Sequence, residues 1–248
     1  MHPLQSALSS QLNFRDLGGI PTMDGRKVIP GLLFRSGDFF SLSPEDIRKL
    51  EGIRLATIID FRAHREIVKR PDKLAGSVKA SIHIEIHDAA RDRAEKFLEE
   101  NNAEGLEHVL VHDYVRMVNN HQHDFRRFLN IVANTDYLPL VFHCAAGKDR
   151  TGLAAVFLLT ALGVDLEHIW DDYMATNVFT KSYTEKIIRK VTESGMNGEI
   201  LRPLLEVRKE YLDAALNEID QKYNGLTNFV LDVLKADCVK LQEKYLTK

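Results

Sequence analysis

Short apolar runs and helical apolar patterns alternate along the first two thirds of this chain. The short runs contain β-branched residues and end at polar or turn residues, which is typical of strands. They cover residues 32–36, 54–62, 78–86 and 139–143. Beyond residue 163 the pattern is helical only. We therefore expect an α/β fold, with a central, mostly parallel sheet flanked by helices and a helical C-terminal extension.

Individual positions predict how these elements begin, end and face the core. Residues 54–62 form a nearly continuous apolar run, as in a strand covered on both faces, whereas residues 78–86 alternate as in a more exposed strand. One helix face repeats with the spacing i, i+3, i+4, i+7 at Phe125, Phe128, Leu129 and Val132. Turn and cap signals predict a hairpin turn, a helix start and a helix stop. They are Asp24-Gly25, Ser43-Pro44-Glu45-Asp46 and Asn224-Gly225.

The length of 248 residues suits one domain with an elaboration, so we treat residues 1–248 as a single domain. Helices are expected near 183–193, 203–222 and 226–245. Residues 165–224, which include the first two of these, form a helical elaboration of the domain. Its amphipathic faces are more typical of core packing than of anything else. The alternative is a lid over a site elsewhere in the chain, hinged at the glycine-containing segment 193–199.

Composition excludes several classes of function. A net charge of −3 gives no broad basic field, so a nucleic-acid partner is not expected. The longest apolar stretch, residues 153–164, is too short to span a bilayer, and no secretory pattern opens the chain, so we expect a cytoplasmic protein without stable membrane insertion. The two cysteines, Cys144 and Cys238, make neither a disulfide framework nor a metal cluster. We expect no metal and no cofactor.

The stretch HCAAGKDRTG, residues 143–152, lies between a predicted strand and a predicted helix. If the loop curls, the backbone N–H groups from Ala145 and Ala146 onward point into its centre, and the helix adds its positive end. Such a loop can hold a tetrahedral oxyanion. Cys144 would lie at the floor of the loop as a thiolate nucleophile, with its pKa lowered by those dipoles. Arg150 would hold the oxygens of the anion that become equatorial when the thiolate attacks. Gly147 permits the backbone turn, and Thr151 can give its hydroxyl to the thiolate.

The same loop has other interpretations. A buried cysteine near a charged helix start is the plain structural alternative. A nucleotide-binding P-loop fails, because Asp149 follows Gly147-Lys148 where Ser or Thr is needed. Two functional alternatives stay open, a phosphate-reading binding module with negligible turnover and a thiol redox or sulfur-transfer protein. The redox alternative would need a resolving cysteine near Cys144, and the other cysteine, Cys238, is far along the chain.

The loop resembles the active-site loop of the cysteine-dependent protein tyrosine phosphatase superfamily, and its GKDRTG half resembles the bacterial PtpB-like branch. Four further segments resemble landmarks of that branch in the same order: NFRDLGG, FRS at 34–36, IDFRAHRE at 59–66 and VRKEYLDAALNEI at 207–219. The resemblance implies a tyrosine phosphatase-like fold and a cofactor-free phosphomonoesterase with a phosphocysteine intermediate. It implies phosphotyrosine in proteins, dual-specificity or phosphoinositide substrates.

The general acid is open between two aspartates. Asp88 follows the predicted strand 78–86, where most of the superfamily carries its acid, but it equally suits a solvated turn. Asp149 lies in the loop itself, and the PtpB-like resemblance favours it, so we take Asp149 as the acid. Lys148 suits a substrate with a second phosphate, or an ion pair with Asp60 or another carboxylate at a strand end.

Residues around the loop have both functional and structural explanations. Asp60 and Arg62 fall at the carboxyl end of a predicted central strand, where open α/β sheets bind ligands, or they form an ion pair with Arg65 and Glu66 that caps the next helix. His143 is expected to organise the loop by bonding backbone carbonyls. Arg15 and Asp16 either brace the site or close a hairpin.

Overall fold

The computed structural model describes residues 13–87 and 90–248. Its centre is a five-stranded sheet of order β1-β2-β5-β3-β4, in which β1 runs antiparallel to β2 and the other neighbours are parallel. The strands are β1 (Arg15–Asp16), β2 (Leu33–Ser36), β3 (Thr57–Asp60), β4 (Ala80–His83) and β5 (Leu140–His143). The expected α/β fold with a mostly parallel sheet is confirmed.

Burial follows the predicted contrast between strands. Every residue of β3 and β5 is buried, whereas β4, at the sheet edge, alternates between half-buried and exposed residues. Along β5, Phe142 packs on one face of the sheet with Phe128 and Leu129, and Val141 packs on the other with Leu50. A continuous apolar run is therefore required wherever helices cover both faces.

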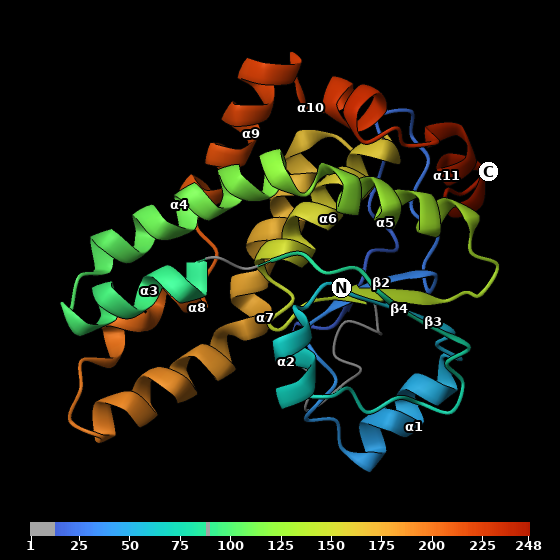
Figure 1. Cartoon of the computed structure of the whole chain (residues 1–248). Helices are drawn as coiled ribbons and strands as arrows, with labels where there is room; N and C mark the ends of the chain where they lie inside the picture. Colours follow the sequence, from blue (N-terminus) through green and yellow to red (C-terminus); the bar gives the residue numbers. More distant parts are fainter. Residues whose placement is uncertain (1–12, 88–89) are drawn as a thin grey trace.

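Helices cover both faces of the sheet (Figure 1). Helix α1 (Pro44–Gly52) lies on one face, and α5 (Gln122–Asn134) and α6 (Asp149–Ala161) lie on the other. The others are α2 (His64–Lys69), α3 (Ala90–Glu99), α4 (Ala103–Asn120), α7 (Leu166–Glu193), α8 (Arg202–Leu205), α9 (Lys209–Tyr223), α10 (Leu226–Asn228) and α11 (Cys238–Tyr245). Figure 1 shows α3, α4 and the second half of α7 extending to one side of the sheet.

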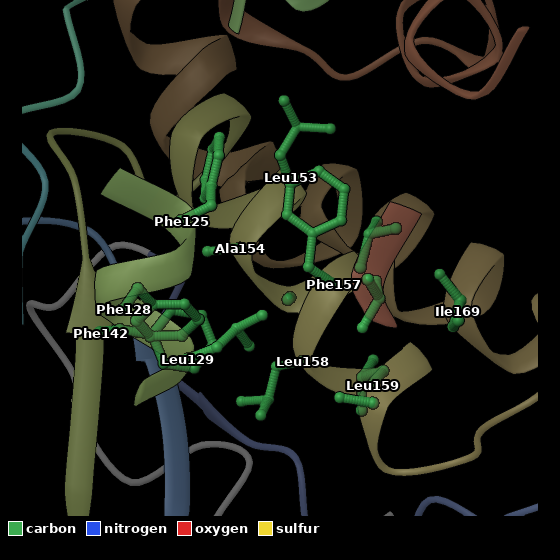
Figure 2. Packing of buried hydrophobic residues seen from close by; sticks show 14 of the residues in the cluster. Phe125, Phe128, Leu129, Phe142, Leu153, Ala154, Phe157, Leu158, Leu159 and Ile169 are labelled. Atoms are coloured by element: carbon green, nitrogen blue, oxygen red, sulfur yellow. The ribbon is translucent and has the colours of Figure 1, made fainter. Parts of the chain in front are cut away.

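Helix α6 contributes many of the buried residues of the core. Phe157 and Phe125 meet edge to face with ring centroids 4.9 Å apart, and Phe128 and Phe142 lie 5.0 Å apart (Figure 2). All residues of α6 except Asp149 and Thr160 are buried. This helix is therefore anchored along most of its length, and the loop before it starts from a fixed point.

The turn and cap predictions are confirmed. Ser43 accepts a bond from the Asp46 backbone and Asp46 accepts one from the Ser43 backbone, which closes a capping box before α1. Gly25 has φ of 89° at the hairpin turn, and its N–H donates to the Thr22 carbonyl. Asn224 ends α9 in the left-handed conformation.

The helix boundaries of the C-terminal third were predicted less well. The helix expected near 183–193 is the second half of one longer, continuous helix, α7, which contains neither proline nor glycine. Its buried face includes three threonines between apolar ends, and hydropathy overlooks them: Ile169, Tyr173, Thr176, Thr180, Thr184 and Ile188. The helix predicted for 203–222 divides into α8 and α9, and that for 226–245 divides into α10, a π-helical turn (Phe229–Val233) and α11. Among the described residues, no helix is both long and apolar enough to cross a membrane.

Candidate active site

The loop of residues 144–148 joins the carboxyl end of β5 to the first turn of α6. In the sheet register, His143 at the end of β5 pairs with Ser36 of β2 on one side and Asp60 of β3 on the other. The loop therefore opens at the edge where three parallel strands end, which is where open α/β sheets place their ligands.

The loop is held in shape by donors outside it. Asp38 N donates to Ala145 O at 3.0 Å, and Asn13 Nδ2 and Arg35 Nη2 donate to Gly147 O at 2.6 and 3.0 Å. A trans peptide directs its N–H opposite to its C=O. The N–H groups of Ala146 and Lys148, which share these peptide planes, are therefore turned away from the surrounding protein and toward the inside of the loop.

Gly147 is required at its position for two reasons. Its φ is 67°, in the left-handed region, and a Cβ built on it would lie 2.3 Å from Ser36 O. The loop and β2 are thus packed backbone to backbone.

Cys144 begins the loop and Arg150 follows it in the first turn of α6, and both are buried, with 3% and 4% of their surface exposed. Cys144 is a free thiol. The guanidinium of Arg150 donates to both carboxylate oxygens of Glu66, at 2.7 and 2.9 Å, and lies 3.4 Å from Ile86 O. Glu66 also accepts a bond from the Ala63 backbone at the start of α2. Glu66 therefore fixes the plane in which Arg150 presents its donors.

His143 lies behind the cysteine, fully buried, and organises the loop as expected. Its Nδ1 lies 3.1 Å from Cys144 O, and its Nε2 lies 3.3 Å from an oxygen of Asp72. Burial lowers the pKa of His143, but the bond to Asp72 and the negative charges of Asp60 and Asp72 outweigh it and raise that pKa above its usual value. A protonated imidazole can donate to both acceptors at once.

Asp60 and Arg62 pair with each other and not with Arg65 and Glu66. Arg62 donates to both oxygens of Asp60, at 2.7 and 3.0 Å, and to Asp72 at 2.7 Å. The expected helix-capping ion pair is therefore wrong in its partners: Glu66 caps α2 by itself. Asp60, Asp72 and His143 offer three ligand atoms close together, but the Arg62 guanidinium lies against both carboxylates, which disfavours a cation there.

The N-terminal segment also braces the loop. Arg15 and Arg35 both pair with Asp172 of α7, with Arg15 Nε 2.8 Å from Asp172 Oδ1, and all three side chains are buried. Arg15 also donates to Asn13 Oδ1, so it supports the donor that holds Gly147. Of the two functions expected for this segment, Arg15 performs the bracing. Asp16 closes the hairpin, since its carboxylate accepts the N–H groups of Gly18 and Gly31.

Lys148 and Asp149 contact each other. Lys148 is 3% exposed, its Nζ donates to Glu206 O at 3.0 Å, and the same atom lies 3.3 Å from Asp149 Oδ1. Its carboxylate partner is Asp149 and not Asp60. The Asp149 side chain is 25% exposed, and its Oδ1 accepts a bond from the hydroxyl of Tyr114 at 2.8 Å.

Two predicted residues make none of the expected contacts among the described residues. The Thr151 hydroxyl is buried and has no hydrogen-bond partner among the described residues, so the bond expected to the Cys144 sulfur is not formed here. Asp88 lies outside the described residues.

A pocket of about 280 Å³ opens beside the loop at Ala145. All its other lining residues are charged: Asp38, Arg62, Arg65, Glu66, Lys69 and Arg70. Arg70 is held by both oxygens of Asp38, at 2.9 and 3.1 Å, and lies over the ring of Phe40. With four cations against two carboxylates, the wall of this pocket carries an excess of positive charge.

Sequence reasoning missed the partners of the loop rather than the loop itself. Glu66 was expected to bond Arg62, and Asp72, Tyr114 and Asp172 were not singled out. Each is an ordinary polar residue in a helix or a turn, so no local pattern distinguishes it. Only IDFRAHRE, which contains Glu66, had a signal, through the family resemblance.

Comparison with known proteins identifies the family of this chain. A sequence profile of the tyrosine phosphatase family matches residues 6–247. A candidate tyrosine-protein phosphatase of Cupriavidus necator (H16_A0669) is 31% identical over 237 residues, covering 94% of this chain and 85% of that protein. The triple specificity protein phosphatase PtpB of Mycobacterium tuberculosis is 25% identical over 256 residues, covering 89% and 90%.

Among solved structures, the core catalytic domain of the PP-IP phosphatase SIW14 from S. cerevisiae gives a TM-score of 0.41 at 16% identity, over 76% of this chain and 96% of that one. This superposition is too loose to compare residues. The sequence matches extend over nearly the whole chain and include the loop, the N-terminal brace and the C-terminal helices. The protein therefore belongs to the tyrosine phosphatase family.

Proposed function

We propose that the enzyme hydrolyses phosphomonoesters through a covalent phosphocysteine on Cys144. The observation that carries this proposal is the placement of Cys144 at the start of one loop, after a central strand, and of Arg150 in the first turn of α6, at the positive end of that helix. The Cys144 thiolate attacks phosphorus as the bond to the leaving oxygen breaks. Arg150 and the inward N–H groups of Ala145–Lys148 hold the three equatorial oxygens.

Asp149 is our candidate for the general acid. Both of its contacts, with Tyr114 and Lys148, reach Oδ1, and we assign the transferred proton to Oδ2. In the first step this proton goes to the leaving oxygen. In the second, a water attacks the phosphocysteine, Asp149 takes its proton, and inorganic phosphate and the thiolate are released. The Thr151 hydroxyl, without a partner in the free enzyme, is available to the sulfur as it leaves.

For the substrate class we propose phosphotyrosine in proteins, in agreement with the family. The name of the mycobacterial relative, a triple specificity phosphatase, supports a range wider than phosphotyrosine. Within that range we include the dual-specificity and phosphoinositide substrates that the family resemblance implies. Lys148 was expected to meet a second phosphate, but its burial and its bond to Glu206 make Lys69, exposed in the pocket wall of α2, the better candidate. We place the reaction in the cytoplasm, where a free nucleophilic thiol stays reduced.

The test is phosphate release from phosphotyrosine peptide and para-nitrophenyl phosphate in the presence of a chelator. The wild type should turn over, and Cys144→Ser should lose at least about a thousandfold, because a serine hydroxyl is a far weaker nucleophile without a base. No release by the wild type would favour a phosphate-binding module. Full release by Cys144→Ser would refute the mechanism. Comparing phosphate release by Asp88→Asn and by Asp149→Asn identifies the general acid. A large loss of release in Asp88→Asn but not in Asp149→Asn would assign the acid to Asp88.

A redox or sulfur-transfer function is disfavoured by the surroundings of the second cysteine. Cys238 is a free, half-buried thiol at the start of α11, and burial raises its pKa. A resolving cysteine needs the opposite, a lowered pKa and close contact with the first thiol.

A further inference from the structure

Three tyrosines from the helices α4, α7 and α9 form a buried cluster that reaches the candidate acid through Tyr114. Tyr114 of α4, Tyr173 of α7 and Tyr211 of α9 are each fully buried. The Tyr114 ring lies edge to face with Tyr173, at 6.4 Å between centroids, and tilted against Tyr211 at 5.9 Å. Hydrophobic burial alone would be satisfied by phenylalanine, so the hydroxyl groups need a separate explanation.

The hydroxyl protons can be assigned from the distances. Tyr114 has one proton, and it lies in the 2.8 Å contact to Asp149 Oδ1. The 2.9 Å contact between the Tyr114 and Tyr173 oxygens must then use the proton of Tyr173. Tyr173 also faces Arg208 O, but at 3.4 Å, which is a much weaker alternative. The result is a directed chain of two donors that ends on one oxygen of Asp149.

Both hydroxyls remain donors over the whole working pH range. Burial and then the charge of Asp149 raise the pKa of Tyr114 and that of Tyr173 well above the usual value. Since Oδ1 accepts from Tyr114 whether Asp149 is ionised or protonated, the proton of Asp149 is directed to Oδ2. Tyr114 thus decides which oxygen carries the proton and in which direction the carboxyl plane lies.

A glycine in the first turn of α6 allows the Tyr173 ring to pack closely against this helix. A Cβ built on Gly152, in the first turn of α6, would lie 3.3 and 3.4 Å from ring atoms of Tyr173. The glycine that closes the KDRTG sequence therefore leaves room for the Tyr173 ring against the helix, one turn from Asp149.

We propose that Tyr114, supported by Tyr173, is a positioning residue for the general acid. Helix α4 then takes part in catalysis by orienting Asp149, and the helical elaboration contributes through Tyr173 of α7. This inference rests on the proposed function, because it takes Asp149 as the acid.

The experiment compares kcat/KM of Tyr114→Phe for aryl phosphates whose leaving phenols range from acidic to as basic as tyrosine. An acidic phenol leaves without a proton, so acid catalysis matters only for the basic ones. Tyr114→Phe should lose roughly tenfold on phosphotyrosine and less than about twofold on the most acidic phenol. Asp149→Asn should show the same slope with a larger loss, about a hundredfold or more.

Tyr245→Phe is the matched control, since Tyr245 is equally buried and donates to Val132 O at 2.8 Å in a contact that does not involve Asp149. The inference would be overturned if Tyr114→Phe loses equally on all phenols, or loses no more than that control. In either case the assignment of Asp149 as the acid stands as long as the loss from Asp149→Asn rises steeply with the basicity of the phenol. A flat Asp149→Asn slope would instead overturn the assignment of the acid and the inference with it. If Tyr114→Phe does not fold, Tyr173→Phe should give the same slope at a smaller loss, and its absence would refute the chain.

Discussion

The buried cluster of Arg15, Arg35 and Asp172 gives the most quantitative prediction. Burial, followed by the charge of Arg35, lowers the pKa of Arg15 to about 10 even though Asp172 lies beside it. The two guanidiniums outweigh burial at Asp172 and hold the pKa of its carboxyl below the usual value. Asp172→Asn keeps the shape of this side chain and removes its charge, so two buried cations lose their counter-ion.

Breaking a buried ion pair from one side costs about 3–5 kcal/mol. For a chain of 248 residues, each kcal/mol shifts Tm by about 2–4 °C, so Asp172→Asn should lower Tm by roughly 6–20 °C. Activity should fall as well, because Arg35 holds Gly147 O. Urea unfolding and thermal scans measure the first effect, and kcat/KM on a phosphotyrosine peptide measures the second.

The neighbouring Asp171 is exposed on the same helix and provides the control, Asp171→Asn. The pH dependence gives a separate check. Because the folded pKa of Asp172 is depressed, its stabilisation is complete above the unfolded value of about 3.9 and is lost as pH falls through the folded pKa. The difference between wild type and Asp172→Asn should stay constant from pH 5 to 8 and shrink below about pH 4. A difference under about 1 kcal/mol at pH 7, or one equal to that of Asp171→Asn, would refute the reasoning.

Three shorter predictions test other parts of the site. Gly147→Ala should destabilise by about 2 kcal/mol or more and abolish turnover, since its Cβ would lie 2.3 Å from Ser36 O; unchanged urea unfolding would contradict this packing. The stability advantage of wild type over His143→Gln should be full below about pH 6.5 and decline as pH rises through the raised folded pKa; an advantage that grows toward pH 9 would argue against a protonated His143. Lys69→Met should reduce kcat/KM for doubly phosphorylated substrates several-fold more than for singly phosphorylated ones, and an equal loss would remove Lys69 from substrate selection.

The loop could be predicted from the sequence because its chemistry is local. Cys144, Gly147 and Arg150 lie within seven positions, and the strand before them and the helix after them have clear patterns. The four parallel strands were equally predictable, since the covered strand β3 is a continuous apolar run and the edge strand β4 alternates, whereas the two charged residues of β1 carry no such pattern. Such signals depend only on neighbouring residues.

The partners of the loop could not be predicted because they come from distant parts of the chain. Glu66 lies 84 positions before Arg150, Tyr114 lies 35 before Asp149, and Asp172 lies 157 after Arg15. A charged or hydroxyl side chain in a helix has no periodic signal that distinguishes a buried partner from a solvated one. Lys148 shows the consequence, because its charge suited both contact with a substrate and an ion pair with a carboxylate at a strand end. In the structure its ammonium group is buried against Glu206 O and lies beside Asp149.

The same contact gives physical content to the expectation of a lid. Glu206 and Val207 lie between α8 and α9, and residues of α7 and of the loop hold this segment. Lys148 bonds Glu206 O, and Asn177 of α7 makes two hydrogen bonds of 2.8 Å with the backbone N–H and C=O of Val207. At the expected hinge, Gly198 is closely packed, since a Cβ there would lie 2.3 Å from Ile188 O. We therefore propose that any opening occurs at the Asn177 contact rather than at residues 193–199.

Removing that contact tests whether the segment shields the thiol. Asn177→Ala breaks both bonds to Val207, each of which contributes about 1 kcal/mol, so an opening equilibrium should become roughly tenfold to thirtyfold more favourable. If opening limits access, peroxide should inactivate Cys144 faster by a similar factor, measured as loss of phosphatase activity at fixed pH. Asn217→Ala, at an exposed position of α9, should leave the rate unchanged. Equal rates for Asn177→Ala and wild type would mean that peroxide reaches Cys144 by another path, through the charged pocket beside Ala145.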